Sequence, residues 1–508
     1  MNVSKIRIAL AATLVAGATP LAAQELLRVP VTYDITSFDP DNSFEALGLG
    51  AIHSVYEGLV EYSPGTTEIT GLLATRWTIS EDGLTYTFDL TDNVSFHDGT
   101  PMDANAVLAA LKRRQGDDMM LSYFLWNVTE MSAPDADTVV LTLGQPQPSL
   151  LDQLASPWGP KITSPVAFAE NAADDNSASW ATENAVGTGP YVLERFARGQ
   201  DYLLVRFNDY HGTAPYFDRI EIPVIPDIGQ QILQLRSGEI DAVPTNYPWA
   251  QLAALAPGLE ITANESMALI LAFVKPGSMI AEDAAVREAV LTAIAPQTWI
   301  VDAFAGYATA AKSLFQAAML TPDNPVVFPT DMEAARAAIE AQGPVSVTLG
   351  YGVEETENVG RVADLLSAQL SSIGVESEVN VLPAGALFVL QGAMETAPDL
   401  LVSRANPDSA HPENQAAVFY QTGAVLNLMG ASLPEADEIA KGAASMTDIA
   451  ERDAAFARAG EMWVEAGKFI PLVDVQDVVV HAEGLTDLGL RPVFPPGNID
   501  FGMVRWAD

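Results

Sequence analysis

The chain has 508 residues, which is too long for one ordinary hydrophobic core and indicates two or three domains. It carries 25 Lys and Arg residues against 66 Asp and Glu, a formal net charge of −41. The electric field of so negatively charged a protein repels the phosphate backbone of nucleic acids, so we expect no nucleic-acid partner. An acidic surface more often serves solubility than the attraction of cationic ligands. The sequence contains no cysteine, which excludes disulfides, thiol catalysis and a lipid-bearing cysteine anchor.

Residues 1–23 have the pattern of a secretory signal peptide. Lys5 and Arg7 precede an apolar run at 8–18, and small residues up to Ala23 offer a cleavage site before Gln24. The apolar run is too short to span a membrane as a helix. We therefore predict an exported, periplasmic, monomeric protein cleaved near Ala23. Loss of the two basic residues changes its formal charge from −41 to −43.

The first third of the chain predicts short strands and one well-capped helix. Asp103 is a plausible N-cap for a helix at 104–114, whose apolar residues recur at helical spacing. Residues 53–62 indicate a helix end that enters a strand. Alternating apolar patterns predict strands at 26–33, 77–80, 86–90, 94–96 and 138–143, a helix follows around 149–154, and 167–185 has the composition of a surface linker.

Residues 185–243 contain the most distinctive patterns. Gly187 and Gly189 flank Thr188, and we expect backbone angles there that other residues cannot adopt. Asp227 is expected to cap a helix that ends at Gly238. The same stretch predicts a hairpin of strands 191–196 and 202–208, then strands at 220–225 and 239–243.

The last part of the chain alternates amphipathic helices with apolar strands. Gly374 is expected to end a helix before a strand at 375–381. The pattern predicts helices at 283–295, 331–341, 358–373 and 450–466, and a strand at 473–480.

Three segments in a fixed order resemble the peptide-binding class of bacterial extracellular solute-binding proteins, family 5. They are Val-Gly-Thr-Gly-Pro-Tyr at 186–191, Phe-Asn-Asp-Tyr-His-Gly at 207–212 and Leu-Arg-Ser-Gly-Glu-Ile-Asp-Ala at 235–242. Receptors of this family feed ABC importers for oligopeptides, dipeptides, nickel chelates and some sugars. Phe-Asp-Pro at 38–40, followed by Tyr-Glu-Gly-Leu at 56–59, is also similar to the family.

The resemblance covers about residues 26–480 and implies an α/β, periplasmic-binding-protein-like fold of class II. It would have two lobes, an extra inserted domain and a hinged ligand cleft. The implied division is a signal peptide at 1–23, a discontinuous domain I at 24–64, 186–272 and 484–508, an inserted domain II at 65–185 and a domain III at 273–483. The same resemblance makes His97 a turn residue rather than a metal ligand.

Catalytic motifs are absent from the sequence. It has no Gly-x-Ser-x-Gly elbow, no His-Glu-x-x-His and no phosphate-binding Gly-x-x-x-x-Gly-Lys. Its five histidines are far apart in sequence, so we predict no metal site and no cofactor. Carboxylates are too plentiful for any pair of them to be informative. A secreted hydrolase that uses two carboxylates remains the alternative from a different class.

The stretch 399–412 is where the resemblance implies ligand contacts. Receptors of the peptide class carry a strand here, then Gly-Trp, then an aspartate that pairs with the ligand's α-ammonium. Asp408 matches that aspartate, whereas Ser403 and Arg404 replace Gly-Trp and His411 stands where an acidic residue is common. Asp408 as a simple Asn-Pro-Asp turn residue is the alternative. Glu45 and Tyr247 complete our set of candidate ligand-binding residues.

A second departure concerns the ligand's carboxylate. In dipeptide receptors, an arginine that follows the strand matching 345–350 binds this group. Here the loop 351–358 carries Glu354, Glu355 and Glu357 and no basic residue. Arg404 could supply the charge from the other side. Otherwise the ligand is longer, cationic or not a peptide.

These patterns predict a substrate-binding protein of an ABC importer rather than an enzyme. It would capture a peptide-like solute in the cleft and deliver it to permease subunits in the inner membrane. The alternative within this role is a non-peptide ligand such as a cationic solute, a metal chelate or an oligosaccharide.

Overall fold

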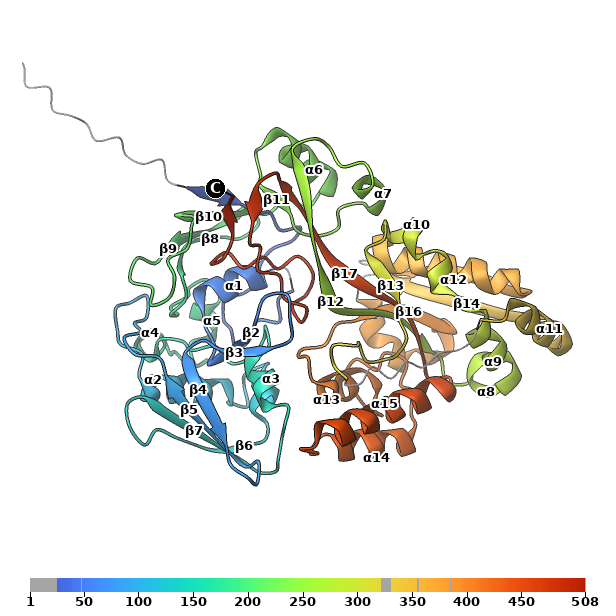
Figure 1. Cartoon of the computed structure of the whole chain (residues 1–508), viewed down its shortest axis with the longest axis horizontal. Coiled ribbons are helices and arrows are strands. Elements are labelled where there is room, and N and C mark those ends of the chain that lie inside the picture. The colour runs from blue at the N-terminus through green and yellow to red at the C-terminus, as the bar shows by residue number, and fades with distance from the viewer. Residues whose placement is uncertain (1–24, 47, 321–329, 354–355, 384, 508) are drawn as a thin grey trace, which may run out of the picture.

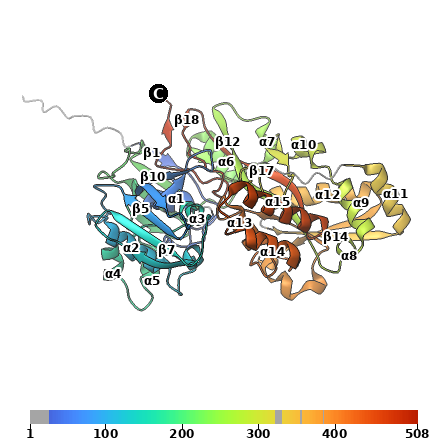
Figure 2. The same ribbon diagram turned by 60° about the horizontal axis from the view of Figure 1, so that its bottom comes forward.

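The computed structural model describes residues 25–46, 48–320, 330–353, 356–383 and 385–507. The predicted signal peptide lies outside these ranges. Two lobes lie side by side, and the long strands β12 (Leu259–Val274) and β17 (Phe469–Ala482) run from one to the other (Figures 1 and 2). Across the described ranges, no helix combines the length and the apolar character that a membrane crossing requires.

The first lobe contains a four-stranded sheet in the order β1-β10-β9-β8. β8 and β9 pair antiparallel from Tyr191–Arg206 to Ala197–Asp201, which confirms the predicted hairpin. The predicted opening strand 26–33 is too long, because after Arg28 only Val31 forms a further bridge. The strands are β1 (Leu26–Arg28), β8 (Tyr191–Ala197), β9 (Asp201–Arg206) and β10 (Arg219–Pro223).

A second four-stranded sheet, in the order β4-β5-β7-β6, lies in the same lobe with α2 (Ala104–Arg114) against β7. The Asp103 carboxylate accepts the Ala106 N–H at 2.9 Å, so the predicted cap and helix bounds are confirmed. The predicted strand 94–96 is wrong, since only Ser95 bridges Pro101. The strands are β4 (Ala74–Ile79), β5 (Thr85–Leu90), β6 (Val128–Ser132) and β7 (Thr138–Leu143).

The stretch predicted as a linker, 167–185, is partly helical. Helix α4 (Pro165–Glu170) begins where the Ser164 hydroxyl accepts the Ala167 N–H, and Pro165 suits the first helical turn. Helix α5 (Ala178–Ala181) follows. The linker prediction was wrong here because the Ala, Asp and Asn content of this stretch does not indicate where a helix is capped.

The Phe-Asp-Pro segment holds the two parts of the first lobe together. The Arg113 guanidinium at the end of α2 donates to Asp39 at 2.8 Å and also to Asp41. Arg114 donates to Asp41 as well, and all four side chains are buried. Bidentate arginine–carboxylate pairs of this kind fix orientation as well as distance.

Gly187 and Gly189 are required for close packing and not for unusual backbone angles, so that prediction was wrong. Neither residue has a positive φ. A Cβ at Gly187 would lie 2.1 Å from the Val55 carbonyl oxygen, and one at Gly189 would lie 2.5 Å from that of Ser54. The segment therefore lies directly against the end of α1 (Leu49–Val55). His97 joins this contact, because its Nε2 lies 2.9 Å from the Gly189 carbonyl oxygen.

The larger sheet has seven strands in the order β11-β17-β12-β16-β14-β15, with β13 paired to β17. We did not predict β12, whose second half is a continuous buried apolar run without alternation. Both β12 and β17 extend from one lobe into the other, so the two lobes share this sheet (Figure 1). The remaining strands are β11 (Ala242–Val243), β13 (Ala308–Ala310), β14 (Val345–Gly352), β15 (Val375–Leu382) and β16 (Leu400–Ala405).

Four predicted helices of the second lobe are confirmed, and a fifth, α14, was not predicted. Asp283 caps α9, and Gly374 follows α12 with a φ of +95°, as expected for a glycine after a helix. These helices are α9 (Ala284–Ala293), α11 (Met332–Gln342), α12 (Arg361–Ser372), α14 (Pro434–Ala443) and α15 (Ile449–Glu465).

Shorter elements complete the fold. Helix α6 (Ile228–Ser237) has the predicted Asp227 cap and ends at Gly238, whose φ is +74°. The others are α3 (Leu150–Ala155), α7 (Trp249–Leu252), α8 (Met279–Glu282), α10 (Ile300–Phe304), α13 (Pro412–Gln415), β2 (Val60–Tyr62), β3 (Ile69–Gly71), β18 (Leu485–Thr486) and β19 (Arg505–Trp506).

Candidate ligand-binding cleft

A cavity of about 240 Å³ lies where the two lobes meet beside β12 and β17. Its walls come from segments that are far apart in sequence, between residues 33 and 496. The lining residues are Tyr33, Ala46, Pro244, Thr245, Asn246, Tyr247, Trp249, Ala268, Asn358, Arg404, Val475, Gln476, Val478, Pro495 and Pro496.

The loop between β11 and α7 forms the wall on the side of the first lobe. Asn246 holds a φ of +58°, a conformation that costs energy for a residue other than glycine. Tyr247 is 5% exposed, and its hydroxyl has no hydrogen-bond partner within the described ranges. The Trp249 indole N–H donates to the Asn358 side-chain oxygen, which belongs to the second lobe. The loop thus meets the opposite wall directly.

The opposite wall is built on the larger sheet. Arg404 on β16 pairs in register with Ile270 of β12, and Ala268 of the same strand also lines the cavity. Among the described lining residues, Arg404 carries the only charged side chain. Asp477 lies close enough for the Arg404 charge to act on its carboxylate, which also accepts the Gly497 N–H at 2.8 Å. Burial raises the pKa of Asp477 to about 7, against the lowering effect of both contacts.

Asp408 lies at a second contact between the lobes and not in the cavity wall. Its side chain is 5% exposed and accepts the Tyr123 hydroxyl at 2.7 Å, and its N–H donates to the Asn414 side chain. Burial raises the pKa of Asp408 to about 6, although hydrogen bonds of its carboxylate with the Tyr123 and Asn414 side chains lower it. Asp408 is therefore not exposed, and its role as a ligand contact or as a turn residue stays a prediction. The carboxylate faces a tyrosine of the other lobe.

His411 caps a helix at the same contact. Its Nδ1 accepts the Glu413 N–H at 3.2 Å, at the start of α13. Burial, together with the charge of Arg452, lowers the pKa of His411 to about 3, so the ring is neutral at physiological pH. The Glu413 carboxylate in turn accepts the Ser149 hydroxyl across the lobe boundary.

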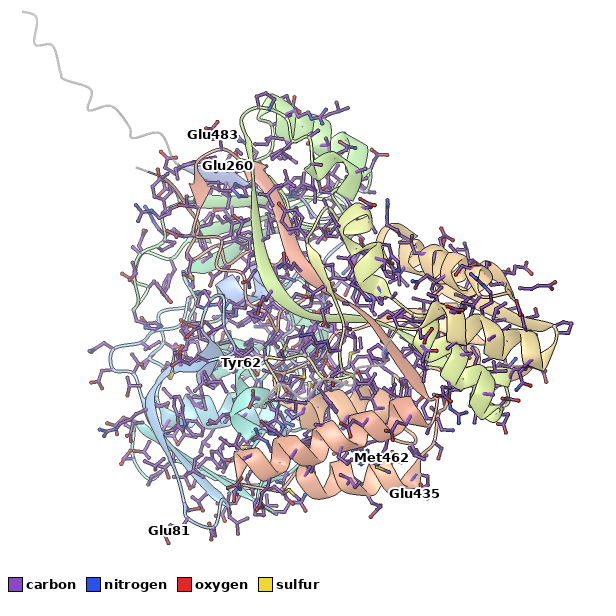
Figure 3. All side chains as sticks on the ribbon, turned by 45° about the vertical axis from the view of Figure 1, so that its right-hand side comes forward. Tyr62, Glu81, Glu260, Glu435, Met462 and Glu483 are labelled. Atoms are coloured by element: carbon purple, nitrogen blue, oxygen red, sulfur yellow. The ribbon has the colours of Figure 1, made fainter. Side chains whose placement is uncertain are left out.

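Tyr62 adds another hydrogen bond between the lobes. Its hydroxyl accepts the Ala410 N–H at 3.0 Å and donates to Asp152 at 2.9 Å. Figure 3 shows Tyr62 in the middle of the molecule, beside the C-terminal helices. Ser156 donates to the Asp408 carbonyl at 2.5 Å nearby. The lobes are therefore joined by several polar contacts on this side.

Glu45 is buried beside the cavity. Its carboxylate accepts the Thr36 N–H at 2.7 Å, its carbonyl accepts the Trp158 indole N–H, and its neighbour Ala46 lines the cavity. The cavity wall thus contains Arg404 and Tyr247, and the other three predicted residues lie outside it. Contact of any of the five with a ligand stays a prediction.

Sequence reasoning missed several lining residues, chiefly Tyr33, Asn246, Trp249, Asn358 and Gln476. A usable signal was the cluster of aromatic and amide side chains at 246–249, directly after the third family motif. Glu354, Glu355 and the side chain of Glu357, which we singled out in the loop 351–358, lie outside the described part of the chain.

Potential metal ligands are dispersed. No group of three or more His, Asp or Glu side chains that could hold a metal ion occurs among the described residues. The His97 and His211 rings instead contact groups of the first lobe, the Gly189 carbonyl and the Glu57 carboxylate.

Comparison with known proteins gives the same fold and family. The glutathione-binding protein GsiB of Salmonella paratyphi A is 30% identical over 381 residues, 74% of this chain and 72% of the relative. The periplasmic binding protein DppA from Helicobacter pylori, solved with the peptide STSA, has a TM-score of 0.76 at 23% identity. It covers 96% of this chain and 99% of its own.

NikA from Brucella suis, solved with Fe(III)-EDTA, has a TM-score of 0.82 at 19% identity and covers 95% of this chain and 99% of its own. These two structures confirm the predicted class II periplasmic-binding fold. The model of bacterial extracellular solute-binding proteins, family 5 Middle, matches residues 68–427. Because that match spans well over half of the chain, the protein belongs to family 5 of the bacterial extracellular solute-binding proteins.

Proposed function

We propose that this protein is the solute receptor of an ABC importer, which captures a peptide-like solute between its lobes and delivers it to permease subunits in the inner membrane. The observation that carries the proposal is the cavity between two lobes that share β12 and β17, in a chain of this family. The glutathione-binding relative and the peptide-bound DppA structure support a peptide-like ligand. In this role the protein binds and releases without turnover.

We assign the candidate residues to this role according to their positions. Arg404 and Tyr247 contact the solute in the cavity, and Glu45 supports the cavity wall through Ala46. Asp408 and His411 belong to the surface that closes against the first lobe. In the open state Asp408 is free to pair with a ligand ammonium, which is the role that the family resemblance assigns to it.

Ligand-dependent closure provides the test. Contacts such as Tyr123 to Asp408 and Trp249 to Asn358 form only when the lobes meet, so a solute that bridges them favours the closed state. We expect the radius of gyration from small-angle scattering to decrease when a mixture of di- and tripeptides is added. The protein is first unfolded and refolded to remove carried-over ligand, and native mass spectrometry then identifies the bound peptide.

Two outcomes would contradict the proposal. Steady consumption of the peptides by the pure protein favours the hydrolase. If the protein instead retains a sugar or a metal chelate and binds no peptide, the non-peptide alternative replaces the peptide as its proposed ligand. The proposed export further requires a mature N-terminus near Gln24 and recovery of a monomer in the osmotic-shock fraction.

A further inference from the structure

We infer that closure of the two lobes depends on protons: Asp408 and Glu413 of the second lobe accept hydroxyl groups of the first, and the ligand-free protein takes up protons when it closes. We call the surface made by Asp408 and Glu413 the acidic contact. Its proton uptake is a property of the ligand-free protein and so goes beyond the proposed capture of a solute.

Hydrogen bonds join the lobes at the acidic contact. The Tyr123 hydroxyl donates to the Asp408 carboxylate at 2.7 Å, and the Ser149 hydroxyl donates to the Glu413 carboxylate. Ser156 also donates to the Asp408 carbonyl oxygen at 2.5 Å. The two serines flank α3, which faces α13 across the lobe boundary (Figure 1). Each bond has its donor in one lobe and its acceptor in the other, so it breaks when the lobes separate.

A third carboxyl group faces this surface from the first lobe. Asp152 lies on α3 and accepts the Tyr62 hydroxyl at 2.9 Å, and that hydroxyl accepts the Ala410 N–H of the second lobe. Burial raises the pKa of Asp152 to about 6 and the charge of Glu413 acts in the same direction, whereas the Tyr62 hydrogen bond lowers it. Burial also raises the pKa of Tyr62 and, to about 12, that of Tyr86 beside Asp152, so both hydroxyls stay neutral. Closing therefore brings carboxyl groups of both lobes together.

The positive charge near Glu413 is shared among several acids. Burial raises the pKa of Glu413, although its hydrogen bond from Ser149 and the charge of Arg452 lower it. The Arg452 guanidinium on α15 also donates to Asp453 at 2.9 Å. Burial and the Arg452 charge lower the pKa of His411 to about 3, so its ring adds no positive charge near neutral pH. The Glu413 carboxylate is therefore only partly compensated.

Asp408 has neutral neighbours instead of cations. Its side chain is 5% exposed, and no cation among the described residues acts on its carboxylate. The charge of Arg114 acts on Tyr123 instead, and burial raises the pKa of that hydroxyl so that it stays a neutral donor. A protonated carboxyl group fits these surroundings, whereas an ionised one leaves a buried charge without a partner.

The resulting pH dependence has a defined sign. Burial raises the pKa of Asp408 to about 6 from its ordinary 3.8, and raises that of Glu413 above 4.5. Once the lobes separate, water reaches both carboxyl groups and their pKa values fall towards the ordinary ones. The closed state therefore binds more protons, and closing is favoured as the pH falls through about 6. For Asp408 alone, a change from pH 7.5 to 4.5 should raise the ratio of closed to open protein about 20-fold.

Single-molecule fluorescence energy transfer between the lobes measures the two populations. The sequence has no cysteine, so Glu81→Cys and Glu435→Cys supply two specific labelling sites. Both residues are exposed, one in the turn between β4 and β5 and the other on α14, and Figure 3 shows them on different lobes. The protein is unfolded, refolded without solute, labelled and followed from pH 7.5 to 4.5. Circular dichroism establishes that it stays folded over this range.

The comparison uses the labelled protein, a double variant and a control. We expect the closed-to-open ratio of the labelled protein to rise about 20-fold or more as the pH falls from 7.5 to 4.5. Asp408→Asn combined with Glu413→Gln keeps the size of both side chains but cannot ionise. At pH 7.5 this double variant should already have the ratio that the labelled protein reaches at pH 4.5, and its ratio should change by less than about threefold. Asp209→Asn, at an exposed carboxylate of the first lobe, should follow the labelled protein.

Three results would overturn the inference. The first is a closed-to-open ratio of the labelled protein that does not change with pH. The second is an equal rise in the double variant, which would trace closure to the loss of net charge over the whole molecule. The third is a double variant that is less closed at every pH, which would mean that the ionised carboxylates hold the lobes together. None of these measurements involves a solute, so the proposed receptor role stands in each case.

Discussion

Asp408 accepts the Tyr123 hydroxyl across the lobe boundary, where almost no water reaches it. The charge of Arg114 acts on Tyr123, but no cation among the described residues acts on the Asp408 carboxylate itself. The protonated form of this buried group is therefore favoured. A ligand ammonium would supply the missing positive charge when the lobes are open.

Asp408→Asn should change how stability depends on pH. In the folded state the pKa of Asp408 is about 6, compared with 3.8 for the unfolded chain. The stabilising contribution of this group is fully present below pH 3.8 and is lost as the pH rises through about 6. Between pH 4.5 and 7.5, wild type should lose about 2 kcal/mol of stability relative to Asp408→Asn, as measured by urea unfolding.

Asp209→Asn, in an exposed turn, controls for the substitution itself. Parallel pH profiles of stability for wild type and Asp408→Asn would show that burial does not raise the pKa of this carboxylate.

The same two proteins test the ligand role of Asp408. Loss of a buried charge partner should weaken the binding of an ammonium-bearing peptide about 30-fold or more.

The segment at 185–190 shows how one element positions another. Its glycines lie against the carbonyl groups at the end of α1, and the strands of the first sheet follow directly. A side chain at either position would push these two elements apart. The family motif is therefore a packing requirement of the first lobe and takes no part in the cavity wall.

Gly187→Ala should be strongly destabilising. The new methyl group would lie 2.1 Å from the Val55 carbonyl oxygen and 2.6 Å from the Tyr56 ring, and neither can move without shifting the backbone or the core. Overpacking of this kind costs about 3 kcal/mol or more. Urea unfolding followed by intrinsic fluorescence measures the change.

Gly442→Ala is the matched control, with the opposite sign. Gly442 lies within α14, is exposed and has open space at its Cβ position. Alanine is the better helix former, so this variant should gain about 0.5–1 kcal/mol. Similar stability changes in the two variants would show that close approach does not explain Gly187.

At the scale of the whole molecule, the excess of carboxylates is spread over both lobes. Figure 3 labels four exposed glutamates at the edges of the molecule, Glu81, Glu260, Glu435 and Glu483. With a formal charge of −41 on the full chain, mutual repulsion between such groups destabilises the compact state.

Added salt should therefore raise the melting temperature at pH 7.5. The Debye length falls from about 30 Å at 0.01 M to about 3 Å at 1 M, so repulsion between surface carboxylates is screened. Differential scanning fluorimetry in increasing NaCl measures the effect. The control is the same titration at pH 4.5, close to the sequence pI of about 4.2, where little net charge remains. An equal effect of salt at both pH values would mean that it does not act through net charge.

Much of the local structure follows from short-range signals in the sequence. The Asp103 and Asp227 caps, the Gly238 and Gly374 helix ends and the hairpin at 191–206 were all predicted correctly. These features depend on a few neighbouring residues, whose hydrogen bonds and backbone angles are set locally. The motifs also identified the family, because their order along the chain does not depend on tertiary contacts.

Long-range packing was not predictable in the same way. The second half of β12 has no alternation because both of its faces are covered, and that covering comes from distant segments. For the same reason the close-packing role of Gly187 could not be seen from the sequence. Its neighbour Val55 is adjacent only in the folded molecule.

The sequence by itself identified the family, predicted the export signal and established the acidic character of the protein. Only the tertiary structure decided which predicted residues share a cavity. Arg404 and Tyr247 line the same space because β16 lies beside β12 and the loop after β11 faces it from the other lobe. Asp408 lies instead at the contact between the lobes, where its carboxylate accepts the Tyr123 hydroxyl. Such proximity arises from packing between distant segments, which no local pattern encodes.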